Sequence, residues 1–435
     1  MPNLQISNII PVSESLVIFV FGSDFSVFSI PESRVISSTK KNDESLEQYK
    51  NIKAPDWDAL KSSKEKKSGK HPKGSDSEDF TIRAATVCPN KKYFAFVTEN
   101  KRLAVYDINA KKERNAKENI NINNSNSNNT YFTITLNSEL SKKGNALCFD
   151  NTSEYIVVGD KFGDGVRYKL VPNNEDFQPE TIFGHVSILT SVLIQPKPDN
   201  TSSNQSSFIV SADRDEKIRV SHYPNSYNIV SFCLGHEEFV STLKIPTFNR
   251  DILFSGSGDG TLRVWNIGNG SCLQVVNIKQ QLSILGYKEQ EIGVLDICCS
   301  NSDSNQPERY PIVVVAIENI NRILVFKYNK TGNNSLEFIT SYKFGHIDEV
   351  PISTAFDFSN KLWISFACNS KYAPQSLMAV LEFNYETLSF DLSSNIESMA
   401  LDKISTTTVE KFAEPTSMFE WGRKSYARGS SSNDL

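Results

Sequence analysis

The chain has 435 residues, a formal net charge of -5 at pH 7 and 39% hydrophobic residues. This length allows two or three ordinary domains or one large repetitive domain, with enough apolar residues for a sizeable core. The negative charge excludes a protein whose whole surface binds nucleic acid, because phosphate binding requires a basic face.

The N-terminus and the cysteines indicate a soluble protein of a reducing compartment. The first residues, MPNLQISNIIPVSESL, lack a basic region followed by an apolar core, and no stretch reaches eighteen apolar residues. The seven cysteines show no CxxC pair or other metal-ligand spacing. We therefore expect a nuclear or cytosolic protein with no membrane span and no metal site.

Two polar segments interrupt an otherwise apolar pattern in the first third of the chain. Residues 34–79 are polar and carry six lysines between Lys61 and Lys73, and residues 110–130 are charged and then rich in Asn and Ser. Such segments bury too little apolar surface to offset the entropy of ordering, so we predict flexible insertions. The lysine run is either a nuclear localisation signal or a solvated linker.

Short strands separated by turn residues fill the rest of the chain. In chain order they lie within 15–30, 93–109, 154–170, 311–328 and 362–386. Many short, regularly spaced strands are typical of a sandwich, a barrel or a propeller. No long amphipathic helix competes with this all-β interpretation.

An internal repeat decides between these folds. SADRDEKIRVSH (211–222) and SGSGDGTLRVWN (255–266) align without a gap at an offset of 44 residues. Gly-His pairs precede both segments, at 184–185 and 235–236, and a third pair stands at 345–346. This is the WD-repeat pattern. It predicts a seven-bladed β-propeller over residues 1–396, followed by a partly disordered C-terminal segment, 397–435.

Polar side chains buried in such a blade need hydrogen-bond partners, which they can supply to one another. A turn Asp can accept a hydrogen bond from the Gly-His imidazole, which also binds a strand Ser that meets a Trp indole. One blade contains the full predicted set, His236, Ser255, Asp259 and Trp265. The preceding blade contains His185, Ser211 and Asp215, but Ser221 replaces the Trp.

The sequence contains no recognisable motif of a catalytic site. Gly256, Gly258 and Gly260 alternate as in a cofactor loop, but a strand follows them where a phosphate-binding loop needs a helix. No GxSxG, HExxH or paired Cys/His set occurs. We predict no catalytic, cofactor-binding or metal-binding residues. A hydrolase site assembled from distant loops remains an alternative.

Several segments together resemble one family, the WD-repeat, non-catalytic subunits of the tRNA (guanine-N7) methyltransferase. They are GDKFGDG (159–165), FGHVSILTSV (183–192), SADRDEKIRVSHYP (211–224), FCLGHEEFVST (232–242) and SGSGDGTLRVWN (255–266). The resemblance implies a heterodimer with a separate catalytic subunit, which holds S-adenosylmethionine and methylates N7 of a guanine in the variable loop of tRNA. Because this chain has a negative net charge, we expect most contacts with tRNA phosphates to come from that partner, with the lysine run at 61–73 as a weak auxiliary. From the lysine run and the lack of a secretory or membrane segment we expect a nuclear location, with the cytoplasm as an alternative.

The resemblance also implies where the partner binds. Its surface is expected around DRDEKIRVS and the neighbouring GDKFGD turn, with Arg219 as the leading contact for a partner carboxylate. The further partner-binding candidates are Lys217, Arg214, Asp213 and Lys161.

Other interpretations of these residues stay open. Arg263 occupies the place of Arg219 in the next blade, so a basic residue there can be ordinary strand decoration, and Asp213 can pair with Arg214 within the chain. We also expect one extra residue in the GDKFGDG turn, which would change the face that Lys161 presents. At the level of function, the alternative is a WD-repeat adaptor for a ubiquitin ligase or for ribosome assembly.

Overall fold

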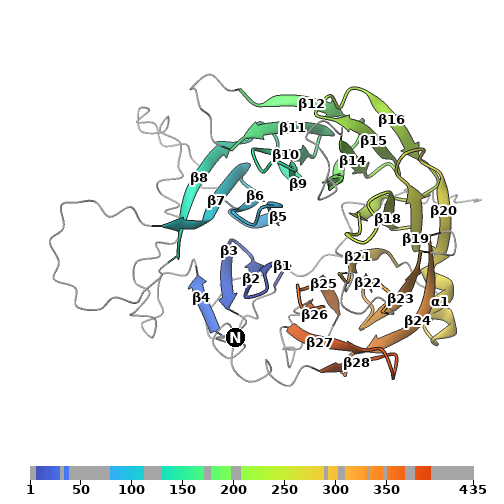
Figure 1. The fold of residues 1–435 in the computed structure, drawn as a ribbon. Coiled ribbons are helices and arrows are strands. Elements are labelled where there is room, and N and C mark those ends of the chain that lie inside the picture. The colour runs from blue at the N-terminus through green and yellow to red at the C-terminus, as the bar shows by residue number, and fades with distance from the viewer. Residues whose placement is uncertain are drawn as a thin grey trace, which may run out of the picture.

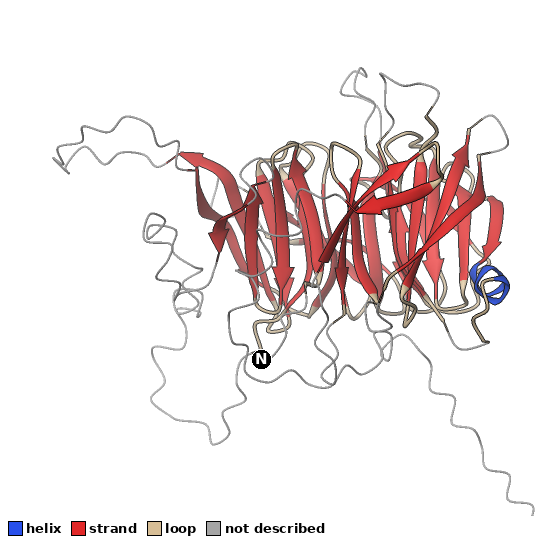
Figure 2. Ribbon diagram, turned by 90° about the horizontal axis from the view of Figure 1, so that it is seen from below, coloured by secondary structure: helices blue, strands red, loops and turns tan. Residues whose placement is uncertain are grey.

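The computed structural model describes residues 6–29, 34–38, 79–111, 130–170, 178–196, 207–288, 292–301, 309–330, 334–345, 350–367 and 378–392. Within these residues the chain forms seven four-stranded antiparallel sheets arranged as blades around a ring (Figure 1). Seen from the side, the ring is a disc whose strands run between two faces made of turns (Figure 2). The predicted seven-bladed β-propeller is thereby confirmed.

Each blade is built from four strands that follow one another in the chain. Blade 1 contains β1 (Asn8–Ser13), β2 (Leu16–Phe21), β3 (Asp24–Ser29) and β4 (Arg34–Ser38). Blade 2 contains β5 (Ile82–Val87), β6 (Tyr93–Thr98), β7 (Arg102–Lys111) and β8 (Thr130–Glu139). Blade 3 contains β9 (Gly144–Phe149), β10 (Tyr155–Asp160), β11 (Asp164–Lys169) and β12 (Glu180–Gly184).

The remaining four blades repeat the arrangement. Blade 4 contains β13 (Leu189–Ile194), β14 (Ser207–Asp213), β15 (Ile218–Tyr223) and β16 (Ile229–Cys233), and blade 5 contains β17 (Val240–Lys244), β18 (Ile252–Ser257), β19 (Thr261–Asn266) and β20 (Cys272–Asn277). Blade 6 contains β21 (Val294–Cys299), β22 (Ile312–Ile317), β23 (Arg322–Asn329) and β24 (Ser335–Lys343), and blade 7 contains β25 (Pro351–Phe356), β26 (Lys361–Phe366), β27 (Met378–Asn384) and β28 (Ser389–Leu392). One short helix, α1 (Ile278–Ile284), follows blade 5.

Two sequence boundaries differ from the structure. Residues 34–38, expected as the start of a flexible insertion, form the outer strand β4 and pair with β3. The 15–30 segment supplies the two middle strands of blade 1 and not the end of a blade. The rest of the first insertion, most of the second one, His346 and the segment 397–435 lie outside the described residues.

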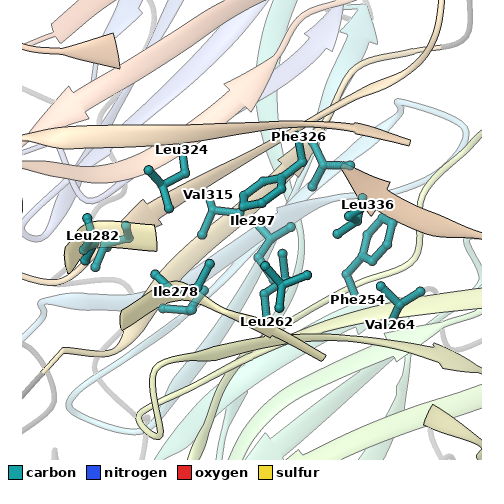
Figure 3. Close-up of a cluster of buried hydrophobic side chains, with 14 of the residues drawn as sticks. Phe254, Leu262, Val264, Ile278, Leu282, Ile297, Val315, Leu324, Phe326 and Leu336 are labelled. Atoms are coloured by element: carbon teal, nitrogen blue, oxygen red, sulfur yellow. The ribbon is translucent and has the colours of Figure 1, made fainter. Parts of the chain in front are cut away.

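The core lies between neighbouring blades. All six residues of β6 and all six of β22 are buried, because each of these strands is covered on both faces by adjacent blades. Figure 3 shows the core between blades 5 and 6, where Phe254 and Leu262 meet Val315 and side chains of β23 and α1. A strand covered on both faces needs apolar residues at consecutive positions, which explains runs such as IVVVAI in place of alternation.

The ring closes between blade 7 and blade 1 by side-chain packing. In the described part of the chain no strand is exchanged between these two blades, since each sheet takes four consecutive strands. Trp363 of β26 is fully buried, and its ring centroid lies 5.9 Å from that of Phe19 and 6.0 Å from that of Phe28. The Ile9 amide donates to Ser353 Oγ at 3.2 Å. Packing of apolar side chains therefore contributes most of the stabilisation between blades 1 and 7.

Shortening Trp363 tests this account of closure. Trp363→Ala removes a fully buried ring at the seam, so we expect the free energy of unfolding to fall by about 3 to 5 kcal/mol in urea denaturation. Phe358→Ala, in the same blade but 40% exposed, should change it by less than about 1 kcal/mol. Equal effects of the two changes would contradict the seam's role.

Candidate functional site

Blade 5 contains a complete buried polar network. His236 Nδ1 donates to Asp259 Oδ2 at 2.8 Å, while Ser255 Oγ lies 2.7 Å from His236 Nε2 and accepts from Trp265 Nε1 at 2.7 Å. These are the four residues named from the sequence. Burial alone would raise the pKa of Asp259, but the hydrogen bond and charge of His236 outweigh it and hold that pKa well below its usual range.

Blade 4 contains the same network with a different carboxylate. His185 Nδ1 lies 2.8 Å from Asp213 Oδ2, and His185 Nε2 lies 2.7 Å from Ser211 Oγ. The assignment of Asp215 to this network is therefore wrong. Asp213 is only 2% exposed, whereas the Asp215 side chain is 32% exposed and lies 3.8 Å from Arg214 Nε.

The two carboxylates differ because a WD turn offers two places for one Asp. Ala212 pairs with Ile218 and Gly256 with Leu262, so the turns of blades 4 and 5 have equal length. Asp213 stands at the last position of β14, where blade 5 has Ser257 at the end of β18. A gapless alignment matches Asp215 to Asp259 and cannot reveal that the His bonds the earlier residue.

The turn of blade 3 follows the same geometry. Gly159 pairs with Gly165, the same spacing as in blades 4 and 5, so the extra residue expected in GDKFGDG does not exist. Asp160 takes the place of Asp213, and its Oδ1 accepts from the amides of Phe162 at 2.7 Å and Asp164 at 3.0 Å. Burial raises the pKa of Asp160. The carboxylate fixes the shape of the turn.

The structure divides the predicted partner-binding residues into two groups. Lys161 and Lys217 are exposed, and Arg214 is partly exposed beside Asp215. Asp213 is buried against His185 and has no surface for a direct partner contact, which corrects its assignment to that surface. It also corrects the alternative of an Asp213–Arg214 pair, because the carboxylate near Arg214 belongs to Asp215.

Arg219 lies partly buried at the border of blades 3 and 4. Its Nη1 donates to the carbonyl oxygen of Gly184 at 3.0 Å, and its guanidinium carbon lies 5.2 Å from the centroid of the Phe183 ring. Its Nε and Nη2 are buried and have no hydrogen-bond partner among the described residues. Burial lowers the pKa of Arg219, with the charge of Asp213 opposing this, so the cation has lost water without gaining an anion in contact.

Backbone hydrogen bonds join the turns that carry these residues. Lys161 N donates to Lys143 O at 3.0 Å, His185 N to Gly163 O at 2.8 Å, and Arg214 N to Ile188 O at 2.9 Å. The GDKFGD and DRDEK turns, 50 residues apart in the sequence, thus belong to one continuous rim. Sequence reasoning missed its exposed apolar residues, among them Phe162, Val186, Phe232 and Leu234, because isolated apolar letters in strands and turns predict burial.

No group of three or more His, Cys, Asp or Glu residues that could hold a metal ion occurs in the described part of the chain. None of its helices has the length and apolar character to cross a membrane.

The seven blades and the buried His networks define a WD-repeat β-propeller. Residues 169–371 match the family model described as the tRNA methyltransferase TRM82 WD40 domain. Over this stretch the chain is similar to the WD-repeat, non-catalytic subunits of the tRNA (guanine-N7) methyltransferase, and the resemblance drawn from the five sequence segments is confirmed.

Individual relatives carry the same description. The "tRNA (guanine-N(7)-)-methyltransferase non-catalytic subunit wdr4" of Dictyostelium discoideum is 30% identical over 61% of this chain and 56% of its own length. The wdr4 subunit of Xenopus laevis is 30% identical over 65% and 61%, and the TRM82 subunit of Candida glabrata is 27% identical over 72% of each chain. The chain spans less than two thirds of the first two relatives.

Solved structures share the fold at low sequence identity. "Structure of U3-55K" aligns with a TM-score of 0.55 and 13% identity over 84% of this chain and 89% of that one. A chain of "Crystal Structure of Mitotic Checkpoint Complex" aligns with a TM-score of 0.55 and 12% identity over 83% and 86%. These likenesses show the propeller fold alone.

The two aspartates of blade 4 give a direct test of the network. Asp213→Asn removes the carboxylate that His185 needs, so we expect the free energy of unfolding to fall by about 1 to 3 kcal/mol. Asp215→Asn alters a partly exposed side chain and should change it by less than about 0.5 kcal/mol. Urea denaturation of both variants at pH 7 provides the measurement, and the reverse order would restore Asp215 to the network.

The pH dependence of stability follows from Asp259. A carboxyl group whose folded pKa lies below its unfolded value stabilises the fold above about pH 4 and loses that contribution as pH falls toward the folded pKa. We expect Asp259→Asn to be less stable than the parent chain at pH 7, with the difference shrinking below pH 4. A difference independent of pH would contradict this origin.

Proposed function

We propose that this chain is the non-catalytic scaffold of a heterodimeric tRNA (guanine-N7) methyltransferase, and that it binds and stabilises the catalytic subunit. The names of the relatives support this proposal, since each is called a non-catalytic subunit of that enzyme. S-adenosylmethionine and most tRNA contacts then belong to the partner. The lysine run at 61–73, which lies outside the described residues, is the basis for proposing a nuclear location.

The observation that carries the proposal is the unpaired edge of Arg219. Nε and Nη2 form the side of a guanidinium that binds both oxygens of a carboxylate, and both atoms lack a partner among the described residues. Nη1 is already held by Gly184, so the orientation of the group is fixed. Because the guanidinium is already desolvated and oriented in the free protein, binding adds little cost in desolvation or side-chain entropy. Most of the favourable energy of pairing with a partner carboxylate then contributes to affinity.

Apolar side chains surround this arginine on the outer strand. Phe232 pairs with Arg219 across β15 and β16, so both side chains lie on the same face of the sheet. Phe232 and Leu234 are exposed, while Phe183 is buried beneath the guanidinium. An arginine enclosed by apolar side chains is typical of an interface hot spot, because those side chains exclude water from the ion pair it forms with the partner.

The division of labour is tested by reconstitution. The purified chain alone is expected to transfer no methyl group to tRNA, and its co-expression with a catalytic tRNA (guanine-N7) methyltransferase subunit should yield a heterodimer that forms N7-methylguanosine. Size-exclusion chromatography and a labelled methyl-transfer assay provide the readouts. Failure of the two chains to associate would overturn the proposed function.

Arg219→Lys tests the contact itself. Lysine keeps the charge but cannot offer two parallel donors, so we expect the dissociation constant of the heterodimer to rise at least about tenfold. Arg322→Lys, a matched change at the start of β23 in blade 6, should leave it within about twofold. An unchanged affinity of Arg219→Lys would show that Arg219, like Arg263, is a basic strand residue with no special role in partner binding. It would not overturn the scaffold function.

A further inference from the structure

An exposed apolar pair on the rim of blades 3 and 4 has no role in the fold. Phe162, in the turn between β10 and β11, is 55% exposed, and Val186, in the loop between β12 and β13, is fully exposed. Neither residue belongs to the buried clusters between blades. Large apolar side chains exposed together on a rigid surface point to a binding site.

Both residues are held by well-defined backbone. Asp160 accepts from the Phe162 amide at 2.7 Å, and Gly163 O accepts from His185 N at 2.8 Å, so the two turns are joined directly beside the apolar pair. Gly163 has φ of +100°, and a Cβ there would lie 2.3 Å from the carbonyl oxygen of His185. Only glycine permits this approach, and the approach brings Phe162 and Val186 onto adjoining turns.

Cations border the aromatic ring. Lys142 Nζ lies 4.2 Å and Lys161 Nζ 5.4 Å from the centroid of the Phe162 ring. Among the described residues neither lysine forms an ion pair. The ring holds two exposed ammonium groups at its border, where they can pair with carboxylates of an incoming protein.

We propose that Phe162 and Val186 are an apolar anchor for the catalytic subunit, which packs an apolar side chain on them and places carboxylates against Lys142 and Lys161. This inference rests on the proposed function and deepens it. The anchor is continuous with the Arg219 surface, because the His185 loop that carries Val186 also bonds to the Arg214 turn through Ile188. Lys161 is a contact that the resemblance already implies for the GDKFGD turn, and Phe162 and Val186 add an apolar contact beside it that fixes the orientation of the partner.

A protein is favoured over nucleic acid as the occupant. A fully exposed valine provides no plane on which a base can stack and no charge for a phosphate, whereas an aliphatic and an aromatic residue with a charged border are typical of protein interfaces. The net charge of the chain, -5, gives no general attraction for RNA.

The test compares three serine substitutions in the full chain. Phe162→Ser and Val186→Ser should each raise the dissociation constant for the catalytic subunit at least about tenfold, measured by calorimetry or surface plasmon resonance. Phe358→Ser is the matched control, since Phe358 is a 40% exposed phenylalanine with Lys91 Nζ 3.7 Å above its ring, on a turn of blade 7. It should leave the affinity within about twofold. All three should keep the parent's thermal midpoint within about 2 °C, because each site is exposed.

Each outcome has a distinct meaning. Absence of a heterodimer with the parent chain overturns the proposed function, and the anchor with it. A parent heterodimer whose affinity is unchanged by Phe162→Ser and Val186→Ser overturns the anchor alone. Loss of tRNA affinity by the assembled complex, with heterodimer affinity unchanged, also overturns it and assigns the surface to RNA. Equal weakening by Phe358→Ser would show a non-specific effect and counts against the anchor.

Discussion

Burial of middle strands on both faces is the constraint on which the rest of this structure depends. A blade of four strands cannot bury its own faces, and residues such as those of β6 and β22 become fully covered only when neighbours stand on either side. The ring satisfies this need for every blade at once. The resulting scaffold is rigid, and its turns are presented in fixed positions at two opposite faces.

Buried carboxylates convert that rigidity into precise turns. Asp160, Asp213 and Asp259 each close a turn between the second and third strands, through amides in blade 3 and through a histidine in blades 4 and 5. Of the side chains that follow these carboxylates, Phe162 is exposed and Arg214 partly exposed, both on backbone that cannot easily rearrange. Preorganised contacts of this kind lower the entropy lost on binding.

The repeat architecture could be predicted from the sequence because its signals are local. Gly-His pairs precede turn segments that align with each other without a gap, and the match of 211–222 to 255–266 predicts the blade 5 network correctly. Asp215 was misassigned because two carboxylates stand two residues apart and only geometry tells which one reaches His185. The extra residue expected in blade 3 reflects a Gly where the other blades place an apolar residue, Gly165 against Ile218. The exposure of Phe162 and Val186 depends on how the turns meet, which no periodicity encodes.

The seam between blades 1 and 7 gives the chain an order of events during synthesis. The contact between Ile9 and Ser353 joins residues 344 positions apart, so the first blade waits for the last to leave the ribosome. During that interval Phe19 and Phe28 lack their Trp363 cover, and the chain exposes apolar surface that the finished ring hides. Closing so long a loop also carries an entropic cost that the other, sequential blade contacts avoid. The nascent protein is therefore vulnerable to misassembly until blade 7 has been synthesised and can cover blade 1.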